Sequence, residues 1–146
     1  MDIKLNWIDG MSFEGAGDSG FVQKMDGENN AAPPMEFIAL GLAGCTAMDV
    51  ISILRKKKQP VAGFQVTVHA DRAEEHPKVF SRAVIEYLVT GKDVDEAALL
   101  RAIELSAEKY CPAQAMLSKA FPMRLIYKIF DTDGKTVLRE GSYTPK

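Results

Sequence analysis

One stretch without a charged residue decides the fold of this chain: FIALGLAGCTAM, residues 37–48. The preceding loop ends at Pro33-Pro34, and helix formers then continue without a break, so the sequence predicts a long helix reaching Lys58. Basic residues 55–58 suit the C-terminal end of the helix dipole. A helix that is apolar nearly all round is buried on most sides. Because a small chain seldom buries a helix so fully alone, we expect a buried central helix and a partner subunit.

Length and composition describe an ordinary globular protein. The 146 residues correspond to one domain, and 47% hydrophobic with 26% charged residues exclude a disordered or collagen-like chain. A formal charge of -2 argues against general binding of nucleic acid or anionic membranes. The uncharged stretch is shorter than the roughly 20 residues that span a bilayer, and the N-terminus lacks a secretory signal. We expect a cytoplasmic protein with a single domain over residues 1–146.

The segments around the long helix predict strands and shorter helices. In residues 1–34, alternating apolar residues and the Asp9-Gly10 turn predict a small antiparallel meander. Alternation over residues 64–70 and 79–89 predicts an antiparallel pair of strands.

Helices and strands also alternate in the C-terminal half. A capping box from Asp93 to Glu96 starts a helix that runs to about Tyr110, and a short helix follows from Cys111-Pro112 to Ala120. Strands at residues 121–130 and 136–139 complete the chain. The order favours an α+β fold, with an antiparallel sheet and two further helices, over a parallel α/β sheet.

The two cysteines are the candidate reactive groups. A chain without an export signal keeps its thiols reduced, which favours redox or nucleophilic chemistry over a structural disulfide. Cys45 lies mid-helix, where a free cysteine also serves as a small buried apolar residue. Cys111 lies at a helix start, where backbone N–H groups stabilise a thiolate modestly. With two His residues and no CxxC, we expect neither a metal nor a cofactor.

Two motifs resemble the OsmC/Ohr family, the osmotically inducible protein C and organic hydroperoxide resistance proteins. They are PMEFIALGLAGCTAMDV at residues 34–50, and AEKYCP at residues 107–112. With the element order, the resemblance covers roughly residues 1–130 and is closest to an uncharacterised OsmC-like branch. It implies an intertwined homodimer with the long helices packed centrally and two sites at the interface.

The resemblance also implies a peroxidase that acts in oxidative stress defence. In the family, a thiolate matching Cys45 attacks an organic hydroperoxide and becomes a sulfenic acid. A thiol matching Cys111 then closes a disulfide, which a dithiol reductant, often lipoyl-based, reopens. Glu36 is the candidate for the family's glutamate, although it stands nine residues before the cysteine instead of ten.

One family residue has no direct match in this sequence. The peroxidases carry an Arg in the N-terminal sheet, whereas the first Arg here is Arg55. Lys4 and Lys24 are the only N-terminal cations that could substitute for it.

Two other functions remain open at the level of sequence. One is a non-enzymatic OsmC-like dimer that binds an apolar or thiol-reactive small molecule in the same cleft. The other is a pair of purely structural cysteines. Within the single domain we expect a meander over residues 1–34, a helix and sheet core over 35–130, and a C-terminal extension over 131–146.

Overall fold

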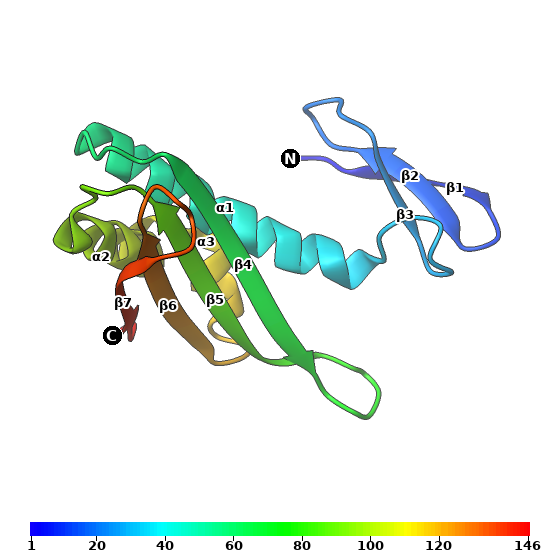
Figure 1. Cartoon of the computed structure of the whole chain (residues 1–146). Helices are drawn as coiled ribbons and strands as arrows, with labels where there is room; N and C mark the ends of the chain where they lie inside the picture. Colours follow the sequence, from blue (N-terminus) through cyan, green and yellow to red (C-terminus); the bar gives the residue numbers. More distant parts are fainter. The chain divides into compact units, whose positions relative to one another are not determined.

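The computed structural model describes all 146 residues, which form two compact units, residues 1–40 and 41–146 (Figure 1). Helices and strands are mixed along the chain, with a three-stranded sheet in the first unit and a four-stranded sheet in the second. The prediction of an α+β fold is therefore confirmed.

The first unit contains the predicted antiparallel meander, in the order β1 (Lys4–Asp9), β2 (Ser12–Ala16), β3 (Gln23–Asp26). Gly10 supplies the positive φ of 48° that the β1–β2 turn requires. The buried carboxylate of Asp26 accepts hydrogen bonds from the Ser12 hydroxyl and the backbone N–H of Glu28. These bonds, led by the one from Ser12, hold the pKa of Asp26 below its ordinary value.

Helix α1 (Pro34–Lys56) is the predicted long helix, and a single chain buries only one stripe of it. The stripe repeats every four residues and consists of Leu42, Thr46, Val50 and Leu54. Leu40 and Met48 are instead 68% and 72% exposed. A single chain therefore does not bury α1 on most sides, and its burial by a partner subunit stays a prediction. By length and composition α1 could also cross a membrane, and only 22% of its most apolar window is buried.

The second unit is built on a sheet in the order β4 (Gly63–Arg72), β5 (Phe80–Thr90), β6 (Met123–Phe130), β7 (Val137–Tyr143). The β4–β5 pair is antiparallel, as predicted, and so is β6–β7. The central β5–β6 pair is parallel, which differs from the expectation of an antiparallel sheet. Parallel neighbours need a long crossover, and the helices between β5 and β6 provide it (Figure 1).

Three helical segments form this crossover: α2 (Glu96–Leu105), the π-helix η1 (Ser106–Tyr110) and α3 (Pro112–Leu117). The cap of α2 is Asp95, whose side chain accepts from the backbone N–H of Ala97, so the predicted cap at Asp93 is wrong. The reason is that Val94 is buried in the core and the chain is still extended at Asp95.

The core of the second unit lies on one face of the sheet. Alternate residues of β5 and β6 are buried there, and they pack with α2 and the buried stripe of α1. The largest fully buried side chains of this core are Tyr87, Leu54, Ile85, Leu99, Ile103, Leu125 and Ile129. The crossover therefore packs against α1, and this packing brings Cys111 near Cys45.

We expect Gly91→Ala to destabilise the protein by about 1–3 kcal/mol through overpacking. A Cβ at Gly91 would lie 2.5 Å from the Pro60 carbonyl oxygen and 2.7 Å from Val94 Cγ2. Gly63→Ala is the matched control, because its Cβ would meet Thr90 at an ordinary 3.5 Å. Urea unfolding measures both variants, and equal midpoints for the two would contradict the prediction.

Candidate functional site

The second unit places Cys45 and Cys111 against each other. Cys45 is partly buried on α1, and Cys111 is 2% exposed at the start of α3. Both are free thiols, and Cys45 is near enough to contribute to the raised pKa of the Cys111 thiol. Gln114 links their surroundings, because its backbone N–H donates to the Cys111 sulfur and its side-chain amide donates to Thr46, the residue after Cys45. Residues 66 positions apart in the sequence therefore form a dithiol pair.

Cys111 caps α3 as the sequence predicted, with Pro112 in the first turn. Its sulfur accepts the backbone N–H of Gln114 at 3.3 Å. Its own backbone N–H donates to the Ser106 carbonyl at 2.9 Å, which closes the wide turn of the π-helix. Local backbone bonds on both sides thus fix the position of this cysteine.

Burial dominates the electrostatics of Cys111. The pKa of the thiol is raised to about 11, chiefly by burial and to a smaller extent by the neighbouring Cys45 and Asp49. The Gln114 N–H bond acts in the opposite direction but is the smaller effect. The stabilisation of a thiolate expected at a helix start is therefore present but outweighed by desolvation, so Cys111 is a neutral thiol at neutral pH.

A network of buried polar side chains surrounds the thiol pair. Thr46, the residue after Cys45, is fully buried, and its hydroxyl lies 2.7 Å from the Tyr87 hydroxyl and 2.8 Å from the Ser106 hydroxyl. The Gln114 amide donates to Thr46 at 2.9 Å. The Ser106 hydroxyl donates to the Asp49 carboxylate at 3.0 Å. Four elements, α1, β5, η1 and α3, meet in this network.

The number of protons that each group can donate determines the direction of these hydrogen bonds. Ser106 has one hydroxyl proton and gives it to Asp49. Ser106 must therefore accept from Thr46, whose proton is then used. Thr46 in turn accepts from Tyr87 and Gln114. Burial raises the pKa of Tyr87 to about 12, which keeps this phenol a donor.

Comparison with known proteins identifies the family. A family model described as "OsmC-like protein" matches residues 27–125. Protein YhfA of Escherichia coli strain K12 is 39% identical over 131 residues, which cover 88% of this chain and 98% of that protein. The chain belongs to the OsmC/Ohr family. The resemblance seen in the sequence is confirmed.

Solved structures of the OsmC/Ohr family share this fold. A hypothetical protein from Aquifex aeolicus VF5 is 28% identical with a TM-score of 0.81, over 89% of this chain and 96% of that one. The organic hydroperoxide resistance protein OhrB of Bacillus subtilis is 14% identical with a TM-score of 0.60, over 88% and 98% of the two chains. At that identity, the second comparison shows the fold alone.

Glu36, the third residue predicted for the site, is exposed in the first turn of α1. It belongs to the first compact unit, whereas Cys45 and Cys111 both belong to the second. The N-terminal cations Lys4 and Lys24 lie exposed on β1 and β3 of the first unit.

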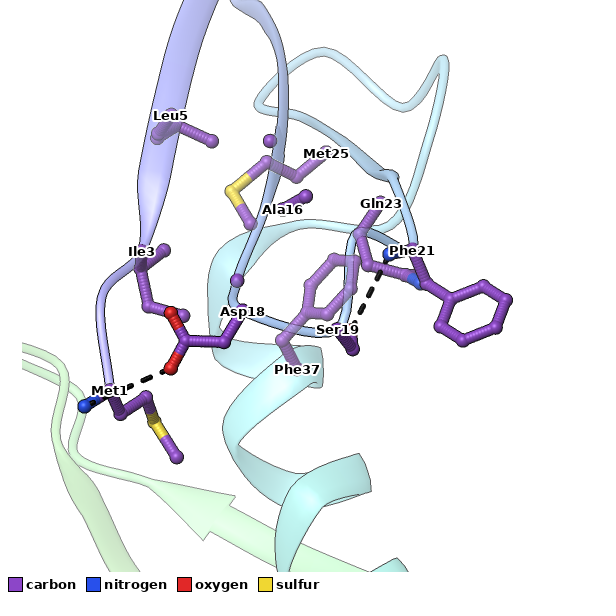
Figure 2. Close-up of a pocket in the computed structure, with 12 residues that line it drawn as sticks. Met1, Ile3, Leu5, Ala16, Asp18, Ser19, Phe21, Gln23, Met25 and Phe37 are labelled. Carbon is purple, nitrogen blue, oxygen red and sulfur yellow. Dashed lines mark hydrogen bonds and ion pairs between the residues drawn. The ribbon is translucent and has the colours of Figure 1, made fainter.

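The first unit contains an apolar cavity of its own, of about 430 Å³. Figure 2 shows side chains from the meander around it, with Phe37 entering from the first turns of α1. The ammonium group of Met1 and the carboxylate of Asp18 form an ion pair beside the cavity at 3.8 Å. Phe37 is the residue of α1 that lines this cavity.

The sequence analysis did not single out Thr46, Tyr87, Ser106 or Gln114 for the site. The one available signal was a polar residue at a position where the apolar spacing of a helix or strand predicts burial. That signal does not say which polar groups meet, because they come from four separate elements.

We expect Cys111 to remain protonated up to about pH 9, because burial raises its pKa to about 11. The measurement is the ¹³Cβ chemical shift of labelled cysteine in the reduced protein as a function of pH. The urea-unfolded chain is the control and should titrate near the ordinary pKa of about 8.5. A thiolate shift for Cys111 at pH 7 in the folded protein would contradict this prediction.

Proposed function

We propose that the protein is a thiol-dependent peroxidase that reduces organic hydroperoxides through a redox pair of Cys45 and Cys111, in oxidative stress defence. The observation that carries the proposal is that two free thiols are neighbours in the second unit, with Gln114 hydrogen-bonded both to the Cys111 sulfur and to Thr46, the residue after Cys45. Membership of a family that includes organic hydroperoxide resistance proteins supports it.

The proposed cycle transfers two electrons. The Cys45 thiolate attacks an oxygen of the hydroperoxide, the O–O bond breaks, the alcohol leaves with a proton, and Cys45 becomes a sulfenic acid. The Cys111 sulfur then attacks the Cys45 sulfur, an S–S bond forms, and water leaves. A dithiol reductant, for which we propose a lipoyl-type group, reopens the disulfide and is itself oxidised to a disulfide.

The environments of the two cysteines assign the two roles. Cys45 is the more accessible, as the residue that meets the hydroperoxide must be. Cys111 is buried and protonated at neutral pH. This suits the second step, because its proton can leave with the hydroxyl group of the sulfenic acid as water. Glu36, in the first unit, remains the third candidate catalytic residue.

We expect Cys45→Ser to lower turnover of cumene hydroperoxide by at least about a thousandfold, because it removes the nucleophile. Cys111→Ser should instead accumulate a Cys45 sulfenic acid that dimedone traps. The measurement is a steady-state assay with dihydrolipoamide, followed by mass mapping of the thiols.

Ala115→Ser is the matched control for this assay, because it introduces a serine at an exposed position of α3. Turnover that survives Cys45→Ser would refute the peroxidase proposal. So would two free thiols in wild-type protein after treatment with hydroperoxide.

We also propose that the protein is a cytoplasmic homodimer in which a second copy covers the apolar face of α1. In a single chain, Ile38 is 44% exposed, Leu40 68% and Met48 72%. Large apolar side chains exposed to this extent along one helix are costly in water and mark an interface.

We expect the wild-type protein to sediment as a dimer at micromolar concentration, with an unfolding midpoint that depends on concentration. Leu40→Glu should weaken the dimer by at least about a hundredfold, because it places a charge in the apolar contact. Gln65→Glu, at an exposed position of β4, is the matched control. A wild-type species of 16.0 kDa in sedimentation would contradict the proposal.

The apolar cavity of the first unit favours a second candidate function, the non-enzymatic binding of an apolar small molecule. The two functions differ in what the thiols do. A binding protein would retain an apolar fluorescent probe in both cysteine variants and show no turnover in the wild type, whereas the peroxidase loses turnover with Cys45.

A further inference from the structure

Gln114 contacts both halves of the dithiol site. Its backbone N–H donates to the Cys111 sulfur at 3.3 Å. Its side-chain amide donates to the hydroxyl of Thr46, the neighbour of Cys45, at 2.9 Å, and to the Tyr87 hydroxyl at 3.4 Å. The side chain is 3% exposed, so these bonds are made without competition from water.

Helix α3 needs such a contact because it is only six residues long. A helix of this length does not hold its own conformation in water and depends on tertiary contacts. Its partly buried residues Ala113 and Leu117 pack on the core without directional bonds. Gln114 supplies the directional bonds that join α3 to α1 and β5.

No other group can replace the Gln114 donor at Thr46. The hydroxyl proton of Thr46 goes to Ser106, and the Tyr87 hydroxyl already donates its single proton to Thr46. Loss of the Gln114 amide would leave one lone pair of the fully buried Thr46 hydroxyl without a hydrogen-bond donor.

We propose that Gln114 is a positioning residue for the resolving thiol: its amide holds the first turn of α3 on Thr46, and this keeps the Cys111 sulfur facing Cys45 while the disulfide closes. The inference rests on the proposed function, since it concerns the disulfide step of that cycle.

Disulfide closure depends strictly on geometry. The step joins the sulfur of the Cys45 sulfenic acid to the Cys111 sulfur and releases water, made from the sulfenic hydroxyl and the thiol proton. The Cα atoms of a disulfide must lie about 4.4–6.8 Å apart with restricted dihedral angles. If α3 moves away, the sulfenic acid persists and a second hydroperoxide converts it to the sulfinic acid. Gln114 thus favours the reversible cycle over irreversible oxidation.

The test is an equilibration of the full-length protein in buffers of reduced and oxidised dithiothreitol. The fraction of protein with a Cys45–Cys111 disulfide gives the effective concentration of one thiol at the other. We expect Gln114→Met, which keeps the size of the side chain and removes its donor, to lower this concentration about fivefold. After a single addition of cumene hydroperoxide, Gln114→Met should also accumulate a dimedone adduct at Cys45. Gln65→Met, at an exposed position of β4, should stay within about twofold of wild type.

Thr46→Val removes the acceptor of the same bond and provides a second variant if Gln114→Met does not fold. It should lower the effective concentration as well, and combining the two substitutions should give less than the product of their effects. Wild-type values in a folded Gln114→Met or Thr46→Val protein would overturn the inference.

Failure of the two proposals can be distinguished. A wild-type protein that forms the disulfide in dithiothreitol buffers but does not turn over hydroperoxide would refute the peroxidase, while the Gln114 comparison still decides this inference. A wild-type protein that forms no Cys45–Cys111 disulfide in any buffer would overturn both.

Discussion

The structure of the site depends on one buried hydroxyl, that of Thr46. It is fully buried in the apolar stripe of α1 and bonds to residues of β5, η1 and α3. A buried polar group without partners is costly, so these three elements can pack on α1 only in the arrangement that satisfies it. That arrangement brings Cys111 near Cys45, the residue that precedes Thr46, because Gln114 bonds both to the Cys111 sulfur and to Thr46. The contacts that pack the core therefore also position the two thiols.

The sequence predicted the parts of the fold that depend on local patterns. Strand alternation, the long apolar helix and the Cys111-Pro112 helix start were all found, because each reflects a repeat or a cap within a few residues. The parallel β5–β6 pair was not predicted, since pairing between distant strands leaves no local signal. The cap of α2 was misplaced by two residues because burial of Val94 decides where the chain turns.

For the site, the sequence indicated the two cysteines but not their surroundings. Gln114 and Ser106 look like ordinary polar helix residues until tertiary contacts bury them. Glu36 was assigned to the site by resemblance alone, and it stays a prediction, because it lies in the first unit and both cysteines lie in the second. Motif spacing thus identifies reactive atoms, whereas the groups that orient them become visible only when the elements are packed.

Asp49 gives this site an electrostatic character that the cysteine motif alone does not reveal. Its carboxylate lies one turn after Cys45 and raises the pKa of both Cys111 and Tyr87 beyond the effect of burial. A negative charge disfavours a second negative charge nearby, so it adds to the effect of burial in keeping the Cys111 thiol and the Tyr87 phenol protonated. The same carboxylate accepts a hydrogen bond from the Ser106 hydroxyl. As a result, Thr46 donates to Ser106 and Tyr87 donates to Thr46. Burial thus sets the protonation of Cys111, Asp49 adds to it, and the same acidic residue sets the direction of the hydrogen bonds around the site.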